Sequence, residues 1–222
     1  MATERASTTA GGRPRDPRIG DAVLTATLEL LETSPYDALA IEEVARRAET
    51  SRPAIYRRWP GRAHLVLAAI ATRLAVPEPP DTGCTLCDLD EGFGVFLEAY
   101  RTIRPEILTA LYAECAADPE LRSRYAATVV DPARAAVGRT LERAVARGDL
   151  REETDRDLLL DLVGALVHHR AAFGEHHLTG AEAAGAIEML LRGAAVDYDA
   201  LLAHSEKVEH IGHPASHPGA PH

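Results

Sequence analysis

The stretch IEEVARRAETSRPAIYRRWPGR, residues 41–62, decides the fold of the N-terminal part of this chain. Four apolar residues recur in it at the spacing of one helical face: Ile41, Val44, Ala45 and Ala48. Ser51 is suited to cap a second short helix, and Pro53 is tolerated in the first turn because amides there have no partner within the helix. Since Pro60 stops that helix, the pattern predicts two short helices joined by a tight turn.

The second helix is expected to show more charge than apolar surface. Ile55 and Trp59 are spaced to hold it onto its neighbours. The remaining side chains form the predicted outer face: Arg52, Ala54, Tyr56, Arg57 and Arg58. Arginine can donate two hydrogen bonds to guanine in the major groove, and a tyrosine hydroxyl can bond a phosphate oxygen.

Arg62 follows the predicted stop, where its charge and nearby backbone amides suit a phosphate. We therefore assign DNA contacts to this residue, to Ser51 and to the outer face of the second helix. From the residue pattern alone, an arginine-rich helix face that is simply solvated is an equally good interpretation.

Four parts of the sequence carry a resemblance to a known family: Ala22–Leu30, Ile41–Ala45, Ser51 and Ile55–Arg62. Together they resemble the N-terminal domain of the tetracycline-repressor (TetR) family of transcriptional regulators, over about residues 18–75. The resemblance implies a three-helix helix-turn-helix DNA-binding domain, followed by a helical domain that binds an effector and dimerises. Two positions depart from the family pattern, since Glu49 replaces the usual glycine of the turn and Ala40 the usual Ser or Thr cap.

The composition of the chain predicts an all-α fold. Aromatic residues make up 5% of the 222 residues, while Ala, Leu, Glu and Arg abound, and no run of alternating β-branched residues suggests a sheet. Charge is unevenly distributed. The chain has 24 basic and 34 acidic residues, of which residues 1–76 hold 11 basic and 9 acidic ones. The remainder therefore has 13 basic and 25 acidic residues, so basic character is concentrated at the N-terminal end.

The sequence predicts a cytoplasmic protein with no membrane span, because no apolar run is long enough and no secretion signal is present. Three cysteines suggest no disulfide framework. Cys84 and Cys87 have the spacing of a metal or redox pair, but no second pair accompanies them. We expect no metal, no cofactor and no catalytic residues, and hence no enzymatic activity.

Four regions are expected: a flexible arm (1–15), the DNA-binding domain (16–76), an effector-binding and dimerisation domain (77–203) and a disordered His-rich tail (204–222). The first helix is expected over 16–33, with Ile19 on its inner face. Near the C-terminus, Thr154 with Asp157 and Thr179 with Glu182 resemble capping boxes of two long helices, which should end near residues 175 and 203.

These two C-terminal helices carry apolar stripes wider than one neighbouring face requires. We expect them to pair with their copies in a partner subunit as a four-helix bundle, which the resemblance also implies. The alternative is that the stripes are buried within their own domain.

The resemblance also implies that the middle helices enclose an effector pocket, for a largely apolar or aromatic small molecule. The candidate lining residues are Phe93, Phe96, Tyr100, Leu111, Tyr112, Cys115, His169 and Phe173. The sequence thus predicts a homodimeric, ligand-responsive repressor, released from a palindromic double-stranded DNA operator by its effector. The alternative is a helical-bundle enzyme or metal-binding protein with an incidental basic helix.

Overall fold

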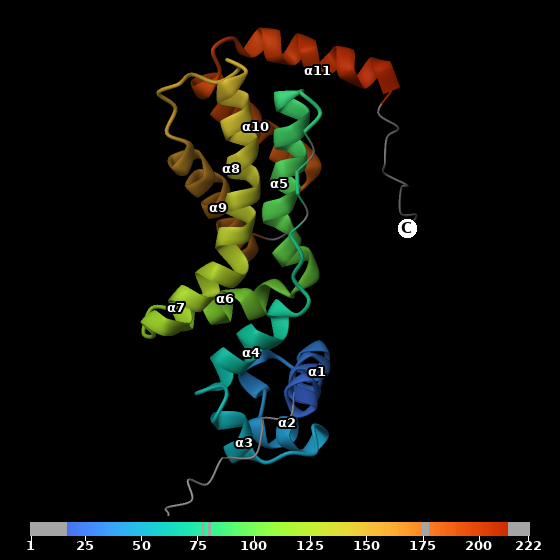
Figure 1. Cartoon of the computed structure of the whole chain (residues 1–222), viewed down its shortest axis with the longest axis vertical. Coiled ribbons are helices and arrows are strands. Elements are labelled where there is room, and N and C mark those ends of the chain that lie inside the picture. The colour runs from blue at the N-terminus through green and yellow to red at the C-terminus, as the bar shows by residue number, and fades with distance from the viewer. Residues whose placement is uncertain (1–16, 77, 80, 175–177, 213–222) are drawn as a thin grey trace, which may run out of the picture. The chain divides into compact units, whose positions relative to one another are not determined.

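The computed structural model describes residues 17–76, 78–79, 81–174 and 178–212 (Figure 1). Over these residues the fold is helical without strands, so the predicted all-α class is confirmed. The chain divides into two compact units, Met1–Val66 and Leu67–His222. This division falls inside helix α4 (Arg62–Ala71), earlier than the boundary after residue 76 that the sequence predicted.

The first unit contains helix α1 (Pro17–Thr33), a 3-10 turn η1 (Tyr36–Ala38), and the short helices α2 (Ile41–Arg47) and α3 (Arg52–Tyr56). The four apolar residues that predicted one face of α2 are all buried. The inner face predicted for α1 is also buried except at Ile19, which is 41% exposed because it lies in the first turn of the helix.

The two departures from the family pattern lie at the two ends of α2. Glu49 adopts a φ of 48°, in the left-handed region that favours glycine. The backbone N–H of Thr50 donates to the Ala45 carbonyl at 2.9 Å and closes the turn. Ala40 occupies the N-cap of α2 without a side-chain hydrogen bond. Both positions therefore give up local stability that other residues would provide.

The second unit is built around α5 (Thr85–Thr102). The helices that follow α5 in the chain are α6 (Pro105–Glu114), α7 (Pro119–Tyr125), α8 (Asp131–Ala146), α9 (Arg156–Phe173), α10 (Gly180–Ala194) and α11 (Tyr198–Gly212), with a π-helical segment, η2 (Ala126–Val130), between α7 and α8. Helix α8 lies along α5, and α9, α10 and α11 also contact α5 (Figure 1). Pro132, which has no N–H to donate, lies in the first turn of α8, directly after the π-helical segment.

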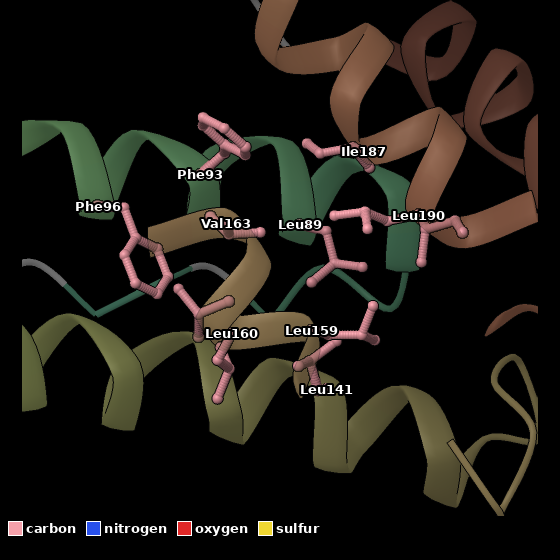
Figure 2. A pocket seen from close by; sticks show the side chains of 11 residues that line it. Leu89, Phe93, Phe96, Leu141, Leu159, Leu160, Val163, Ile187 and Leu190 are labelled. Carbon is pink, nitrogen blue, oxygen red and sulfur yellow. The ribbon is translucent and has the colours of Figure 1, made fainter. Parts of the chain in front are cut away.

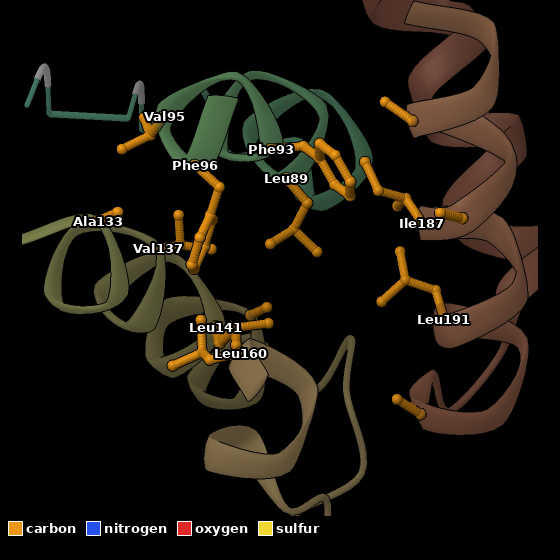
Figure 3. Packing of buried hydrophobic residues seen from close by; sticks show 14 of the residues in the cluster. Leu89, Phe93, Val95, Phe96, Ala133, Val137, Leu141, Leu160, Ile187 and Leu191 are labelled. Atoms are coloured by element: carbon orange, nitrogen blue, oxygen red, sulfur yellow. The ribbon is translucent and has the colours of Figure 1, made fainter. Parts of the chain in front are cut away.

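The core of this unit fills the space between α5, α8, α9 and α10 (Figure 3). Leu89, Phe93 and Phe96 of α5 point into this space. They pack with side chains from the other helices, among them Val137, Leu141, Leu160, Ile187 and Leu191.

The structure corrects the predicted C-terminal helices. Asp155, not Thr154, caps α9, because its carboxylate accepts the N–H of Leu158 at 3.0 Å. The capping box of Thr179 and Glu182 is confirmed. The helix that it starts ends at Ala194 rather than near residue 203, since the backbone there turns to pair Ala195 with Leu150.

Helix α11 corrects the predicted tail. The chain resumes a helix at Tyr198, and Asp197 accepts the N–H of Ala200 at 3.0 Å in its first turn. The helix extends to Gly212, so the prediction of disorder from residue 204 onward is wrong for residues 204–212. The rest of the predicted tail, and the predicted arm over 1–15, lie outside the described residues.

Candidate functional site

Helix α3 is short and held by few apolar contacts. Ser51 occupies its N-cap with extended backbone angles, but the hydroxyl makes no capping hydrogen bond. Ile55 is buried and Trp59 half-buried, as their spacing predicted. The helix ends at Tyr56, while backbone hydrogen bonds continue to Arg58 and Trp59, both of whose N–H groups donate to the Ile55 carbonyl.

Three long side chains of this segment are exposed to solvent: Arg52, Tyr56 and Arg57. Ala54, predicted on the same face, is half-buried. Arg52 forms an ion pair of 2.7 Å with Glu42 of α2, and its guanidinium lies 6.0 Å from the centre of the Tyr56 ring. Because both partners of this ion pair are largely exposed, it contributes little and can be exchanged for a phosphate.

Arg58 differs from the prediction of an outer-face residue, because it is half-buried. Its guanidinium lies against Gly20 of α1, so closely that a side chain at position 20 would collide with it. This arrangement gives Arg58 a role in holding the end of the α3 segment onto α1.

Arg62 is also engaged within the first unit. Its guanidinium donates to the Asp37 carbonyl at 3.0 Å, pairs with the Asp37 carboxylate at 3.5 Å, and lies 4.6 Å from the centre of the Tyr36 ring. These contacts tie the start of α4 to the turn after α1. The predicted phosphate contact of Arg62 stays a prediction, and these partners would compete with it.

Glu43 of α2 binds two arginines beside this surface. Arg46 and Arg47 donate to its carboxylate at distances of 2.6 to 2.9 Å. These hydrogen bonds lower the pKa of Glu43 to about 2, first through Arg46 and then through Arg47. The two arginines of α2 therefore share one carboxylate, whereas no ion pair is found for Arg57 among the described residues.

The second unit contains an apolar cavity of about 40 Å³ (Figure 2). Phe93 and Phe96, two of the predicted effector residues, line it. The other lining residues come from α5, α8, α9 and α10: Leu89, Val137, Leu141, Leu159, Leu160, Val163, Ile187, Leu190 and Leu191. The sequence predicted His169 and Phe173 as the pocket residues of α9, but the apolar residues of α9 and α10 that line the cavity were assigned to the dimer interface instead.

A polar cluster contains two other predicted effector residues, Tyr100 and Tyr112. The Tyr100 hydroxyl lies 2.9 Å from Nδ1 of His168, and the rings of Tyr112 and His168 are 4.3 Å apart. Tyr125, which the sequence reading missed, packs edge-on against Tyr112 at 6.0 Å between ring centres.

Burial fixes the protonation of this cluster. It raises the pKa of Tyr100 to about 12 and also raises the pKa of Tyr125. Burial, followed by the charge of His169, lowers the pKa of His168. At neutral pH a protonated phenol therefore faces a neutral imidazole, and the Tyr100 hydroxyl can donate to Nδ1 of His168.

The remaining predicted effector residues are dispersed. Leu111 is fully buried, and the buried Cys115 thiol donates to its carbonyl at 3.2 Å. His169 is exposed and lies 5.3 Å, between ring centres, from Phe173, which is 78% exposed. None of these four lines the apolar cavity.

Cys84 and Cys87 form a disulfide at the start of α5. Of the two possibilities that their spacing raised, a metal pair or a redox pair, the disulfide corresponds to the second, while Cys115 is free. The two cysteines lie close enough because the first turn of a helix brings residues three apart together.

Two helices of the second unit leave apolar side chains uncovered in the single chain. Leu158 and Leu162 of α9 are about half exposed, and Met189 of α10 is 74% exposed. In the part of the chain that is described, no helix is both long and apolar enough to cross a membrane.

The sequence matches two family models. Residues 23–69 match "Bacterial regulatory proteins, tetR family", and residues 79–190 match "Tetracyclin repressor-like, C-terminal domain". The chain is 30% identical, over 155 residues, to the DNA-binding transcriptional repressor TetR of Mycobacteroides abscessus; the match covers 69% of this chain and 82% of that protein.

Two further proteins are similar. The uncharacterised transcriptional regulator YdeS of Bacillus subtilis is 29% identical over 72% of this chain and 81% of its own length. The crystal structure of the TetR-family regulator SCO0332 superposes with a TM-score of 0.61 at 29% identity, over 79% of this chain and 98% of that one. The helix-turn-helix unit, the helical second unit and these matches together show that the chain belongs to the TetR family of transcriptional regulators.

Proposed function

We propose that the protein binds a palindromic DNA operator as a homodimer and acts in the cytoplasm as a repressor. The observation that carries this proposal is the exposed surface of Ser51, Arg52, Tyr56 and Arg57. Arg57 is the candidate for reading a base, because its guanidinium is exposed and, among the described residues, has no ion pair. Ser51 and Tyr56 offer hydroxyls to phosphate oxygens, and Arg52 offers its charge.

The uncovered apolar side chains of α9 and α10 support the dimer. Leu158, Leu162 and Met189 would be buried between two copies, as in the four-helix bundle that the sequence predicts. Gly185 and Gly193 of α10 have open space where a side chain would extend, so a partner helix could approach closely there. A dimer of this kind presents α3 twice, and the two copies would need centres about 34–36 Å apart to enter successive major grooves.

The apolar cavity is the proposed centre of the effector site. Its volume of about 40 Å³ is far below the roughly 300 Å³ or more of a typical ligand site, so an effector would have to part the surrounding helices. Since all its lining residues are apolar, it favours an uncharged ligand.

The hydrogen-bonded pair of Tyr100 and His168 lies one helical turn beyond the cavity on α5 and α9. Tyr100 follows Phe96 by four residues on α5, and His168 follows Gly164 by four on α9. The Phe96 ring packs against Gly164, with 3.6 Å between the ring and the position that a side-chain carbon would take. Phe96 therefore lies between the cavity and the Tyr100–His168 pair. An apolar or aromatic effector with one polar group would displace this ring and meet the pair.

Repression and effector binding are coupled through a difference in affinity between two states of the dimer. The effector would favour the state with widened cavities, and the operator the state with the correct α3 spacing. Helix α4 contains the division between the two units and is the proposed covalent link.

The test starts with selection of bound sites from random DNA duplexes. A palindromic consensus is expected, with an affinity that falls steeply as salt rises. Compounds are then screened for release of the selected duplex. A protein that selects no sequence, or binds DNA without salt dependence, would contradict the proposal and favour the enzyme or metal-binding alternative.

Two variants test the effector site once a releasing compound is known. Tyr100→Phe should weaken that compound by about 1 kcal/mol if its polar group meets the hydroxyl. Phe96→Ala should change compound selectivity toward larger ligands while leaving operator affinity intact. Glu91→Ala, at an exposed position of α5, serves as the control for both. If all three changes altered compound binding equally, Tyr100 and Phe96 would not be part of the effector site.

A further inference from the structure

The disulfide of Cys84 and Cys87 has no part in the proposed DNA or effector sites. We propose that this pair is a reversible dithiol–disulfide site, with small dithiols and their cyclic disulfides as its substrates. The location of this site in the cytoplasm rests on the proposed function, because a protein that binds the operator acts there. Disulfides there are rare, and those that occur are usually transient.

The two sulfur atoms have different surroundings, which sets the direction of attack. Cys84 is 1% exposed, whereas Cys87 is half-buried and more accessible. A reductant therefore reaches the Cys87 sulfur first. Helix α11 covers one side of the Cys87 sulfur, because the Ser205 hydroxyl oxygen lies 4.0 Å from it.

Cys84 is the better leaving group. It is the N-cap of α5, and its sulfur accepts the backbone N–H of Cys87 at 3.3 Å. The N-terminal end of a helix stabilises negative charge, so a thiolate on Cys84 is favoured over one on Cys87. A leaving thiolate that is stabilised in this way speeds thiol–disulfide exchange.

The exchange is balanced by the dithiol alone. A thiolate of the dithiol attacks the Cys87 sulfur, the bond between the two cysteines breaks, and Cys84 leaves as a thiolate. The second thiol of the reagent then attacks the mixed disulfide and releases Cys87. The reagent is oxidised to its cyclic disulfide, the protein gains two electrons, and the two thiol protons of the reagent end on the cysteines.

The turn around the disulfide is held by contacts that do not depend on the sulfur–sulfur bond. The N–H and hydroxyl of Thr82 donate to the buried carboxylate of Asp88 at 3.0 and 2.7 Å, and the N–H of Cys84 donates to the Thr82 hydroxyl oxygen at 3.2 Å. Arg147 donates to the Thr85 hydroxyl at 2.7 Å. Reduction can therefore proceed while the first turn of α5 stays folded.

The first experiment uses the full chain with Cys115→Ser, which removes the third thiol. The protein is equilibrated with graded ratios of dithiothreitol and its cyclic disulfide, without denaturant. We expect two alkylatable thiols to appear together along one reversible titration, with the helical circular dichroism unchanged. A disulfide that is reduced only after the chain unfolds would overturn the proposal.

The second experiment compares single-cysteine chains in the same background. Cys84→Ser leaves the half-buried Cys87, and Cys87→Ser leaves the buried Cys84. The first should form a mixed disulfide with an aromatic disulfide reagent at least about tenfold faster than the second, because the difference in access to the two sulfurs outweighs the greater stability of the Cys84 thiolate. Equal rates, or the reverse order, would overturn the assignment of Cys87 as the attacked sulfur. Neither experiment involves DNA, so its failure is distinct from a failure of the proposed function.

Discussion

The α3 surface and the α9–α10 surface are exposed in opposite ways. Around α3 the exposed side chains are charged or hydroxylated except for Pro53, whereas α9 and α10 expose the apolar Leu158, Leu162 and Met189. A charged helix face is suited to a polyanion that exchanges with water and salt, while an apolar face is suited to a copy of itself. In the proposed complex, the α3 surface would determine which DNA is bound, and the surface of α9 and α10 would determine how many subunits bind it.

The largest expected effect comes from a charge on the apolar surface. Leu162→Glu should produce a monomer, because two carboxylates would face each other in the interface. Operator affinity should fall by about 100-fold or more, since the second α3 no longer binds within one complex. Sedimentation and DNA titration measure the two effects. Ala146→Glu, at an exposed position of α8, is the matched control. If the Leu162→Glu variant is still a dimer, this surface is not the dimer interface.

The next largest effect is expected on the recognition of operator bases by Arg57. Arg57→Ala should cost about 1–3 kcal/mol of operator affinity and relax preference at one base pair in each half-site. Binding to a panel of single-base operator variants measures it. Arg122→Ala, which removes an exposed arginine of α7, should change neither quantity. Unaltered selectivity in the Arg57 variant would show that Arg57 does not read a base.

A smaller effect is expected from the tyrosine hydroxyl. Tyr56→Phe should weaken binding by about 1 kcal/mol on every sequence, because a phosphate contact carries no base information. The same operator panel provides the measurement. A loss confined to a few sequences would place the hydroxyl on a base instead.

The smallest expected effect concerns the stability of the turn before α3. Glu49→Gly should raise the free energy of unfolding by about 0.5 kcal/mol, since relief of the left-handed backbone exceeds the added flexibility of the unfolded chain. Thermal unfolding of the full chain tests it, with Glu114→Gly in α6 as a destabilising control. A lower melting temperature for the Glu49 variant would contradict this account.

The first unit was predictable from sequence because its rules are local. The spacing of Ile41, Val44 and Ala45 determines the buried face of α2. Pro53 lies in the first turn of α3, although this helix ends at Tyr56, before the predicted stop at Pro60. Even there, the positions of Arg58 and Arg62 depend on residues far away in the chain, Gly20 and Asp37, that no local pattern connects to them.

The second unit was predicted less well because its details are tertiary. The end of α10 depends on the pairing of Ala195 with Leu150, although Asp197 was a readable signal for the start of α11. Helical spacing identified Phe93 and Phe96 as inward-facing, but it could not show which neighbouring helices would leave a gap beside them.

That gap has a thermodynamic consequence. At roughly 24 cal/mol per Å³, an enclosed void of about 40 Å³ would lower the stability of the second unit by about 1 kcal/mol, which is an upper bound because this pocket is partly open. Because the lining is apolar, the space is expected to admit xenon under pressure. The protein without a ligand would thus be slightly underpacked. Any molecule that fills this space should raise the melting temperature, which can be measured before its effect on transcription is known.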